Sequence, residues 1–246
     1  MSRELDVPLL RQLAPDLLRF GLELVVEFEP HSLWYETSLT IAAQALRNQA
    51  KTDYHTFQHI PSEIRENLAQ FGLNVHQLEQ GGLLRVLDTY TVTTAIGSPE
   101  RPKVGRQPYE SQSIKLSDWS LAAMHDLKSP HEIPDAEKRR LHIDDNTSVL
   151  LQYNSEKEMI DYWRTRFIAW TRARELIMVH SIVPGVYSDS FYRQLETLMD
   201  GIIDFRSQEK DEKLEHQVRV RMIRGKNYDS SWRKLRLLEN GEVALT

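Results

Sequence analysis

Residues Leu22 to Leu46 read Leu-Glu-Leu-Val-Val-Glu-Phe-Glu-Pro-His-Ser-Leu-Trp-Tyr-Glu-Thr-Ser-Leu-Thr-Ile-Ala-Ala-Gln-Ala-Leu. The first part, Leu22–Phe28, is mostly apolar and β-branched, which favours a buried strand. The last part, Ser38–Leu46, is rich in alanine and leucine and favours a helix. Between them, Pro30–Thr37 is expected to be a loop. A strand that passes through a short loop into a helix is the repeating unit of an α/β fold.

The same alternation continues along most of the chain. We expect further strands at Asp53–Phe57, Leu83–Leu87, Arg140–Ile143 and Leu176–Val179. Helices are expected at Pro8–Phe20, Pro61–Gly72, Ser117–Leu127, Glu156–Arg174 and Asp189–Met199, with a short turn at Asn74–Glu79. Because strands that alternate with helices usually lie parallel, the pattern predicts a mostly parallel central sheet with helices on both faces.

The C-terminal part has a different pattern. Val218, Val220 and Met222 alternate with arginines, which is typical of a half-exposed strand. Together with an expected strand at Gly201–Phe205, an acidic tip at Glu209–Glu215 and a strand at Trp232–Leu238, this segment predicts antiparallel strands. We expect one domain over residues 1–246, in which the polar, proline-containing residues 97–114 form a loop or insertion.

Composition excludes several classes of protein. The chain has 246 residues, 40% of them hydrophobic, and no cysteine, so it has neither disulfides nor thiolate metal sites. A net charge of -5 makes a nucleic-acid partner unlikely on electrostatic grounds. No apolar run approaches the roughly 20 residues that span a membrane, and the N-terminus lacks an apolar signal core. We therefore expect a cytoplasmic protein without a membrane partner.

Four stretches resemble the KaiC branch of the RecA-like ATPases, which includes RadA-type recombinases. Ile60–Ile64 followed by Phe71–Val75 resembles the family's P-x-E-I and F-G-W-D segments, and Gly82–Tyr90 is similar to its third strand. Arg140–Ser148 resembles the Walker B segment. Met199–Asp204 and then Arg219–Gly225 resemble the ending A-D-G-I-I and R-x-x-R-G. The resemblance covers nearly the whole chain and implies a RecA-like P-loop fold.

The resemblance places the phosphate-binding loop at Pro30–Thr37, where the family pattern is G-x-x-x-x-G-K-[ST]. Pro30 and Tyr35 stand at the glycine positions, Glu36 stands at the lysine position, and Thr37 keeps the hydroxyl. Proline lacks an N–H group, and a tyrosine ring occupies space that the phosphates need. Glu36 puts a negative charge where the family has a cation. The sequence therefore predicts a degenerate loop.

Some of the family's other functional residues have a counterpart in this chain. The resemblance puts Asp144, followed by Asp145, at the Walker B position, where the aspartate helps to hold magnesium. Gln58 and His59 stand where the family has paired glutamates that prepare the attacking water. Arg224 matches an arginine that approaches a neighbouring subunit's nucleotide. From the residues alone, Asp144 and Asp145 are either metal ligands or caps of the following segment, and we favour the second interpretation.

Other chemical groups give weaker signals. His55 and His59 are four residues apart but straddle a junction between strand and loop, and no third ligand is evident, so we expect no metal site. His180 and Ser181 lack a nucleophile elbow, so a catalytic pair is not expected. The basic residues from Arg219 to Lys226 favour one solvated face of a strand over an anion-binding surface.

Taken together, these features predict a pseudo-ATPase. We expect a KaiC-like protein that does not hydrolyse ATP and acts in signal transduction as a regulatory or scaffolding subunit, in a homo-oligomer or with an active paralogue. No cofactor is expected. One alternative is an ATP-binding protein or weak ATPase that uses ATP and magnesium through a non-standard loop with Asp144 and Thr37. Another is a DNA-associated recombinase paralogue.

Overall fold

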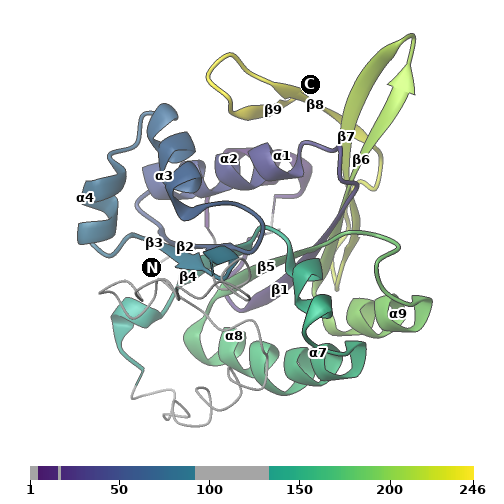
Figure 1. Ribbon diagram of the computed structural model, residues 1–246, viewed down its shortest axis with the longest axis horizontal. Coiled ribbons are helices and arrows are strands. Elements are labelled where there is room, and N and C mark those ends of the chain that lie inside the picture. Colours follow the sequence, from purple (N-terminus) through teal and green to yellow (C-terminus); the bar gives the residue numbers. More distant parts are fainter. Residues whose placement is uncertain (1–4, 16–17, 92–132) are drawn as a thin grey trace, which may run out of the picture.

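A single sheet of nine strands runs through the part of the protein that the structure, a computed structural model, describes: residues 5–15, 18–91 and 133–246 (Figure 1). The strand order is β3-β2-β4-β5-β1-β6-β7-β8-β9. Pairings from β3 to β6 are parallel and those from β6 to β9 are antiparallel, which confirms the predicted α/β class. The strands are β1 Leu22–Phe28, β2 Lys51–Thr56, β3 Leu84–Asp88, β4 Arg140–Asp144, β5 Ile177–Ile182, β6 Gly201–Lys210, β7 Lys213–Ile223, β8 Arg233–Leu237 and β9 Val243–Leu245.

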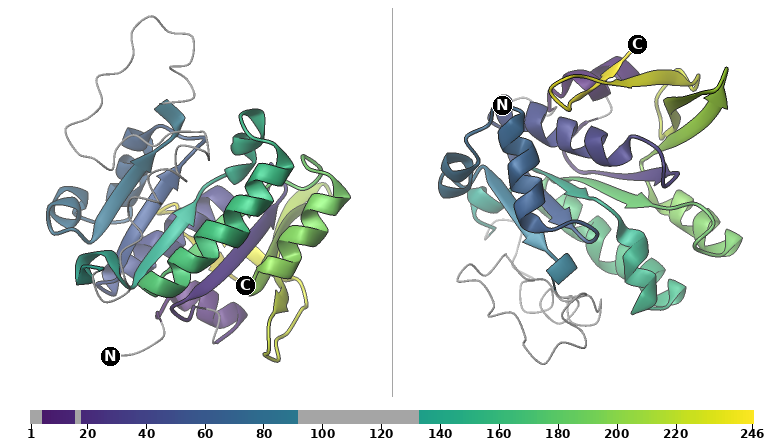
Figure 2. Two further views of the ribbon diagram at one scale, coloured as in Figure 1. Left: turned by 90° about the horizontal axis from the view of Figure 1, so that it is seen from below. Right: turned by 45° about the horizontal axis from the view of Figure 1, so that its top comes forward.

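Helices cover both faces of this sheet. Figures 1 and 2 show α1, α2 and α3 on one face and α7, α8 and α9 on the other. The α-helices are α1 Pro8–Leu13, α2 Trp34–Arg47, α3 Pro61–Gln70, α4 Val75–Gln80, α7 Glu156–Tyr162, α8 Ile168–Arg174 and α9 Asp189–Leu198. Among the described residues, no helix has both the length and the apolar character needed to cross a membrane.

The two faces of the sheet bury two separate apolar clusters. Successive side chains of a strand point to opposite faces, so Leu24 and Val26 of β1 pack with α2, whereas Val25 packs with α7 and α9. Among the described residues, the face toward α2 carries apolar side chains and some uncharged polar ones, such as Thr52 and Ser181. The opposite face carries buried charged groups between its apolar side chains, and these groups form the centre of the candidate site.

Helix α2 begins earlier than the sequence predicted. It starts at Trp34, four residues before the expected Ser38, so half of the predicted loop Pro30–Thr37 is helical. The preceding residue, Leu33, offers no side-chain cap, and this is why the start could not be recognised from the sequence. Only residues 29–33 connect β1 to α2, which leaves a tight turn at this edge of the sheet.

The expected helix Glu156–Arg174 is present but interrupted. Its start is defined by a capping box in which Ser155 and Glu158 satisfy each other's backbone N–H groups. A π-helical turn, Trp163–Phe167, separates α7 from α8. The end is marked by Glu175, which has a left-handed conformation with φ of 53°.

The C-terminal antiparallel strands are confirmed, with changes in their extent. Strands β6 and β7 continue through most of the predicted tip at 209–215 and turn only at Asp211 and Glu212. Strand β9 was not predicted, and α1 ends at Leu13 instead of Phe20. The predicted loop at 97–114 and the predicted helix at 117–127 lie outside the described residues.

Candidate functional site

The turn between β1 and α2 is held by its own backbone and by β6. The amide and hydroxyl of Ser32 both donate to the Glu29 carbonyl, at 2.9 and 2.7 Å. The amide of Ser207 donates to the Glu29 carboxylate at 2.8 Å, and its hydroxyl donates to the His31 carbonyl at 2.8 Å. The turn is therefore anchored to the neighbouring strand, and its carbonyl and carboxylate oxygens are used in that anchoring.

Trp34 fills the space beneath this turn. Its side chain is buried and lies edge-on to Phe205, with the ring centroids 5.2 Å apart. Its indole N–H donates to the backbone carbonyl of Asp145 at 3.1 Å. The first residue of α2 thus connects the β1 turn to the end of β4 through both apolar packing and a hydrogen bond.

Tyr35 and His59 stack on each other across the same edge of the sheet. Their ring centroids are 3.8 Å apart, with an interplanar angle of 17°. The Tyr35 hydroxyl accepts a hydrogen bond from Asn67 of α3 at 3.0 Å. Burial, followed by the nearby charge of Glu63, raises the pKa of Tyr35 above its ordinary value, so the ring stays neutral. Tyr35 is therefore packed into the structure on both sides.

Two further predicted loop positions, Glu36 and Thr37, lie in the first turn of α2. The Thr37 hydroxyl is buried and donates to the Leu33 carbonyl at 2.5 Å, within the first turn of α2. Glu36 is half-buried in the same turn, where a carboxylate interacts favourably with the positive end of the helix dipole. Both residues thus stabilise the start of the helix.

Asp145 organises the loop between β2 and α3. Its carboxylate accepts from the Phe57 amide at 2.7 Å, the Thr56 hydroxyl at 3.0 Å and His59 Nδ1 at 2.9 Å. Gln58 is exposed, and its side-chain oxygen accepts from Asn146 at 3.1 Å. The structure therefore brings Asp145, Gln58 and His59 together.

The capping role that we expected for the two aspartates is wrong in its detail. The residue that caps the following 3₁₀ helix, Thr147–Gln152, is Asn146, whose side chain accepts from the Ser148 amide at 3.0 Å. Asp145 caps the loop after β2 instead. Asp144 points to the other face of the sheet, because adjacent residues of a strand point in opposite directions.

Asp144 is buried among three histidines on the face that α7 and α8 cover. His180 Nδ1 lies 2.6 Å from one carboxylate oxygen, whereas His142 Nε2 and His55 Nδ1 lie 3.0 and 3.2 Å from the other. Trp163 and Phe167 of the π-helical turn pack against the His180 ring, with centroids 5.3 and 4.8 Å away. This polar cluster is thus closed by aromatic side chains.

Further acidic groups extend the cluster along the sheet. His180 Nε2 lies 2.9 Å from the carboxylate of Glu23, which also accepts a hydrogen bond from the Thr171 hydroxyl of α8. On the other side, His142 Nδ1 is 3.8 Å from Asp53, which forms a buried ion pair with Arg140 at 2.6 Å. The cluster crosses β1, β5, β4 and β2 in order. Several of its members were missed by the sequence analysis.

The electrostatics of this cluster favour positive charge on the imidazoles of His142 and His180. Burial by itself would lower the pKa of His142, but attraction and hydrogen bonding by Asp144 and Asp53 outweigh it and raise that pKa to about 10. For His180, burial is likewise outweighed by hydrogen bonds from Asp144 and Glu23, and the pKa rises to about 9. Burial would raise the pKa of Asp144, but the three histidines hold it well below its usual range.

The C-terminal arginines divide into paired and exposed groups. Arg219 lies 2.7 Å from Asp204, and Arg221 lies 2.5 Å from Glu27, so these two basic side chains are neutralised locally. Arg224 is exposed, and its Nη2 donates to the Thr197 carbonyl at 2.7 Å. Arg224 lies just beyond the end of β7 and is far from the α2 turn in the sequence.

Replacement of Arg140 by methionine tests the cluster's buried ion pair. Asp53 would then lose its nearest guanidinium partner and keep the more distant one of Arg85, 4.0 Å away, so we expect Arg140→Met to lower the free energy of unfolding by about 3–5 kcal/mol. Urea denaturation measures this loss. The matched control is the adjacent Arg139→Met, whose ion pair with Glu175 is at the surface and contributes no more than about 1 kcal/mol. An equal decrease in the free energy of unfolding in the two variants would show that the buried ion pair stabilises the fold no more than the surface pair does.

A family model described as the KaiC ATPase matches residues 39–242, which is well over half of the chain. The match includes every strand from β2 to β8, and it begins just after the β1 turn and the first turn of α2. A search of curated proteins finds no match. The mostly parallel sheet with helices on both faces and C-terminal antiparallel strands is consistent with the RecA-like fold that the sequence implied. The chain belongs to the KaiC ATPase family.

Proposed function

We propose that the protein is a KaiC-like subunit that does not hydrolyse ATP and acts as a regulatory or scaffolding component. It acts through self-assembly or through association with an active paralogue. The observation that carries the proposal is the stacking of Tyr35 on His59, whose Nδ1 is hydrogen-bonded to Asp145. These residues join the start of α2, the loop after β2 and the end of β4, the elements that surround the phosphates and magnesium in a P-loop ATPase.

The groups that bind magnesium in the family have other partners here. The Thr37 hydroxyl donates to a carbonyl of its own helix. Both carboxylate oxygens of Asp144 face histidines on the side of the sheet opposite α2. These residues therefore do not suit a magnesium–nucleotide complex at the start of α2, and this supports a subunit without hydrolytic activity.

The phosphate-binding positions also argue against nucleotide. Glu36 replaces a lysine, so a bound phosphate would face a carboxylate. Two negative charges about 4 Å apart repel by about 4 kcal/mol at an effective dielectric constant near 20. Pro30 offers no N–H to a phosphate oxygen. The family match begins at Leu39, so the degenerate stretch Pro30–Thr37 lies just before the matched residues.

Arg224 supports a role in assembly. RecA-like domains place nucleotide between neighbouring subunits, so a subunit with an inactive site of its own can still present an arginine to the next subunit. Arg224 is exposed, and among the residues that the structure describes its side chain donates one hydrogen bond, to the Thr197 carbonyl. The pairing of Arg219 and Arg221 with acidic side chains gives no support to the DNA-associated alternative.

Thermal unfolding with magnesium and ATP tests the inactive site. Ligand at a 100-fold excess over its Kd would stabilise the fold by about 2.7 kcal/mol. For a chain of this length that is a rise of roughly 5 to 10 °C in the melting midpoint. We expect no rise and no phosphate release. A rise of that size in the unaltered protein would favour the alternative of an ATP-binding protein or weak ATPase.

The variant Pro30→Gly/Tyr35→Gly/Glu36→Lys serves as the comparison in the same measurement. It restores the motif residues but leaves Trp34 and the Asp145 contacts in place, so we expect at most a small ATP-dependent rise in its melting midpoint. A full rise would show that the three replacements alone account for the loss of nucleotide binding.

Light scattering at two protein concentrations tests the assembly. We expect a molar mass above the 28.8 kDa of one chain, either alone or after mixing with an active KaiC-family ATPase. Arg224→Ala should reduce the ATPase activity of the mixture, because this arginine would no longer reach the neighbouring nucleotide. Arg236→Ala, a change at an exposed arginine on β8, is the control. A strict monomer that leaves the paralogue unaffected would contradict the proposal.

A further inference from the structure

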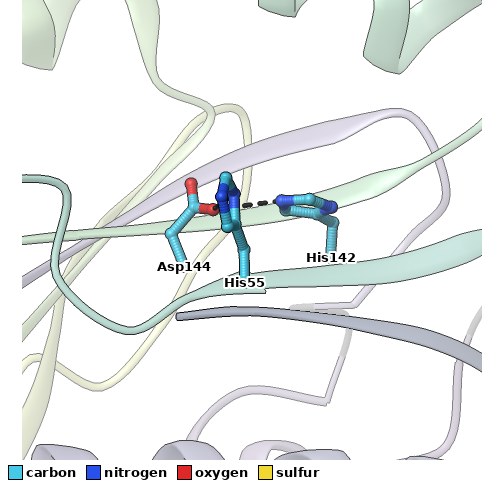
Figure 3. A group of neighbouring side chains, drawn as sticks. All are labelled: His55, His142 and Asp144. Carbon is cyan, nitrogen blue, oxygen red and sulfur yellow. Dashed lines mark hydrogen bonds and ion pairs between the residues drawn. The ribbon is translucent and has the colours of Figure 1, made fainter. Parts of the chain in front are cut away.

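Three side chains of the buried polar cluster converge on a single point. Figure 3 shows His55 of β2 beside His142 and Asp144 of β4, with the imidazoles directed toward the carboxylate. One ligand atom from each residue lies within 4.8 Å of the other two. His55 Nδ1 and His142 Nε2 are 3.2 and 3.0 Å from the same oxygen of Asp144. Ligand atoms bound to one tetrahedral ion at about 2.0–2.1 Å lie about 3.3 Å apart, so these separations suit a metal.

Each of the three residues is also oriented by a partner on its far side. His55 Nε2 is 2.8 Å from the Thr89 hydroxyl, and His142 Nδ1 faces the Asp53 carboxylate at 3.8 Å. The second oxygen of Asp144 accepts from His180 at 2.6 Å. Such outer contacts set the histidine tautomer and aim the remaining nitrogen at the metal. The nitrogens of His55 and His142 that face Asp144 are the ones directed toward the proposed ion.

Two buried carboxylates of the cluster, those of Asp144 and Glu23, need positive charge that the described lysines and arginines do not supply. Asp144 and Glu23 are buried, and among the described residues they contact histidines and a hydroxyl but neither lysine nor arginine. Asp53, in contrast, is paired with Arg140. Buried carboxylates must be neutralised by protons, ions or metals. A divalent cation bound to the neutral imidazoles of His55 and His142 would place two positive charges beside Asp144, in exchange for the proton that His142 otherwise carries.

We propose that His55, His142 and Asp144 bind a divalent transition-metal ion of the zinc class. Two histidine nitrogens and one carboxylate oxygen form a donor set that selects zinc or ferrous iron over magnesium, which prefers oxygen. The ion links the carboxyl ends of β2 and β4 across the face of the sheet that α7 and α8 cover. The site is separate from the start of α2, and the proposal does not depend on the absence of ATP hydrolysis.

Cobalt titration of the full-length protein tests the site. The protein is first stripped with a chelator and shown to be folded by circular dichroism. We then expect one Co²⁺ per chain with the visible absorption of a tetrahedral ion, a rise in the melting midpoint, and displacement by one equivalent of Zn²⁺. A folded, stripped protein that takes up neither ion, with no change in its midpoint, would show that protons on the histidines neutralise the cluster instead.

Variants assign the ligands. His142→Gln and Asp144→Asn should abolish the cobalt spectrum, whereas His76→Gln, which alters an exposed histidine of α4, should leave it unchanged. Thr89→Val keeps the side-chain volume and all three ligands but removes the orienting hydroxyl of His55, so we expect affinity to fall about tenfold or more. Because this variant keeps every ligand, it remains informative if the ligand variants do not fold. Unchanged affinity in both Thr89→Val and a folded His142→Gln would overturn the assignment.

Discussion

The burial of two adjacent carboxylates at the end of β4 is the constraint on which the site depends. The alternation of side chains along a strand directs Asp144 and Asp145 to opposite faces of the sheet. On each face the buried carboxylate must find hydrogen-bond donors or a positive charge. Asp145 is satisfied by the loop after β2, by His59 and by Thr56. Asp144 is satisfied by three histidines from three strands. These two sets of contacts join the central strands at the edge where α/β proteins bind ligands.

The same constraint connects the family's fold to the proposed loss of its chemistry. Once Asp144 is engaged by histidines and Asp145 by a loop, neither carboxylate is directed toward the first turn of α2. That turn is stabilised internally by Trp34, Tyr35 and the Thr37 hydroxyl. Tyr35 thus has structural partners in α3 and in the loop after β2, and Glu36 lies in the first turn of α2, whereas Pro30 is exposed in the turn before it.

Some features were predictable from the sequence because the signal was local. Strand Leu22–Phe28 was predicted with its observed bounds, since a short, mostly apolar segment between turn residues has few alternative conformations. The start of α2 was not, because Leu33 provides no capping side chain. The histidine cluster was missed because its members lie far apart in the sequence. A signal was present, however: Asp53 and His55 in one strand, and Arg140, His142 and Asp144 in another, occupy alternate positions, so the members of each set share a face. Only the register of β2 on β4, which pairs Asp53 with His142 and His55 with Asp144, brings the two sets to the same face.

The π-helical turn at Trp163–Phe167 has a consequence for how the cluster is covered. A turn of this kind corresponds to one extra residue in an α-helix, and it rotates the following segment relative to the preceding one. On the two sides of this turn, α7 buries Met159 and Ile160 in the apolar core, and α8 presents the Thr171 hydroxyl to Glu23. One helical segment interrupted by a π turn thus supplies apolar side chains to the core from its first part and a hydroxyl to a buried carboxylate from its last part.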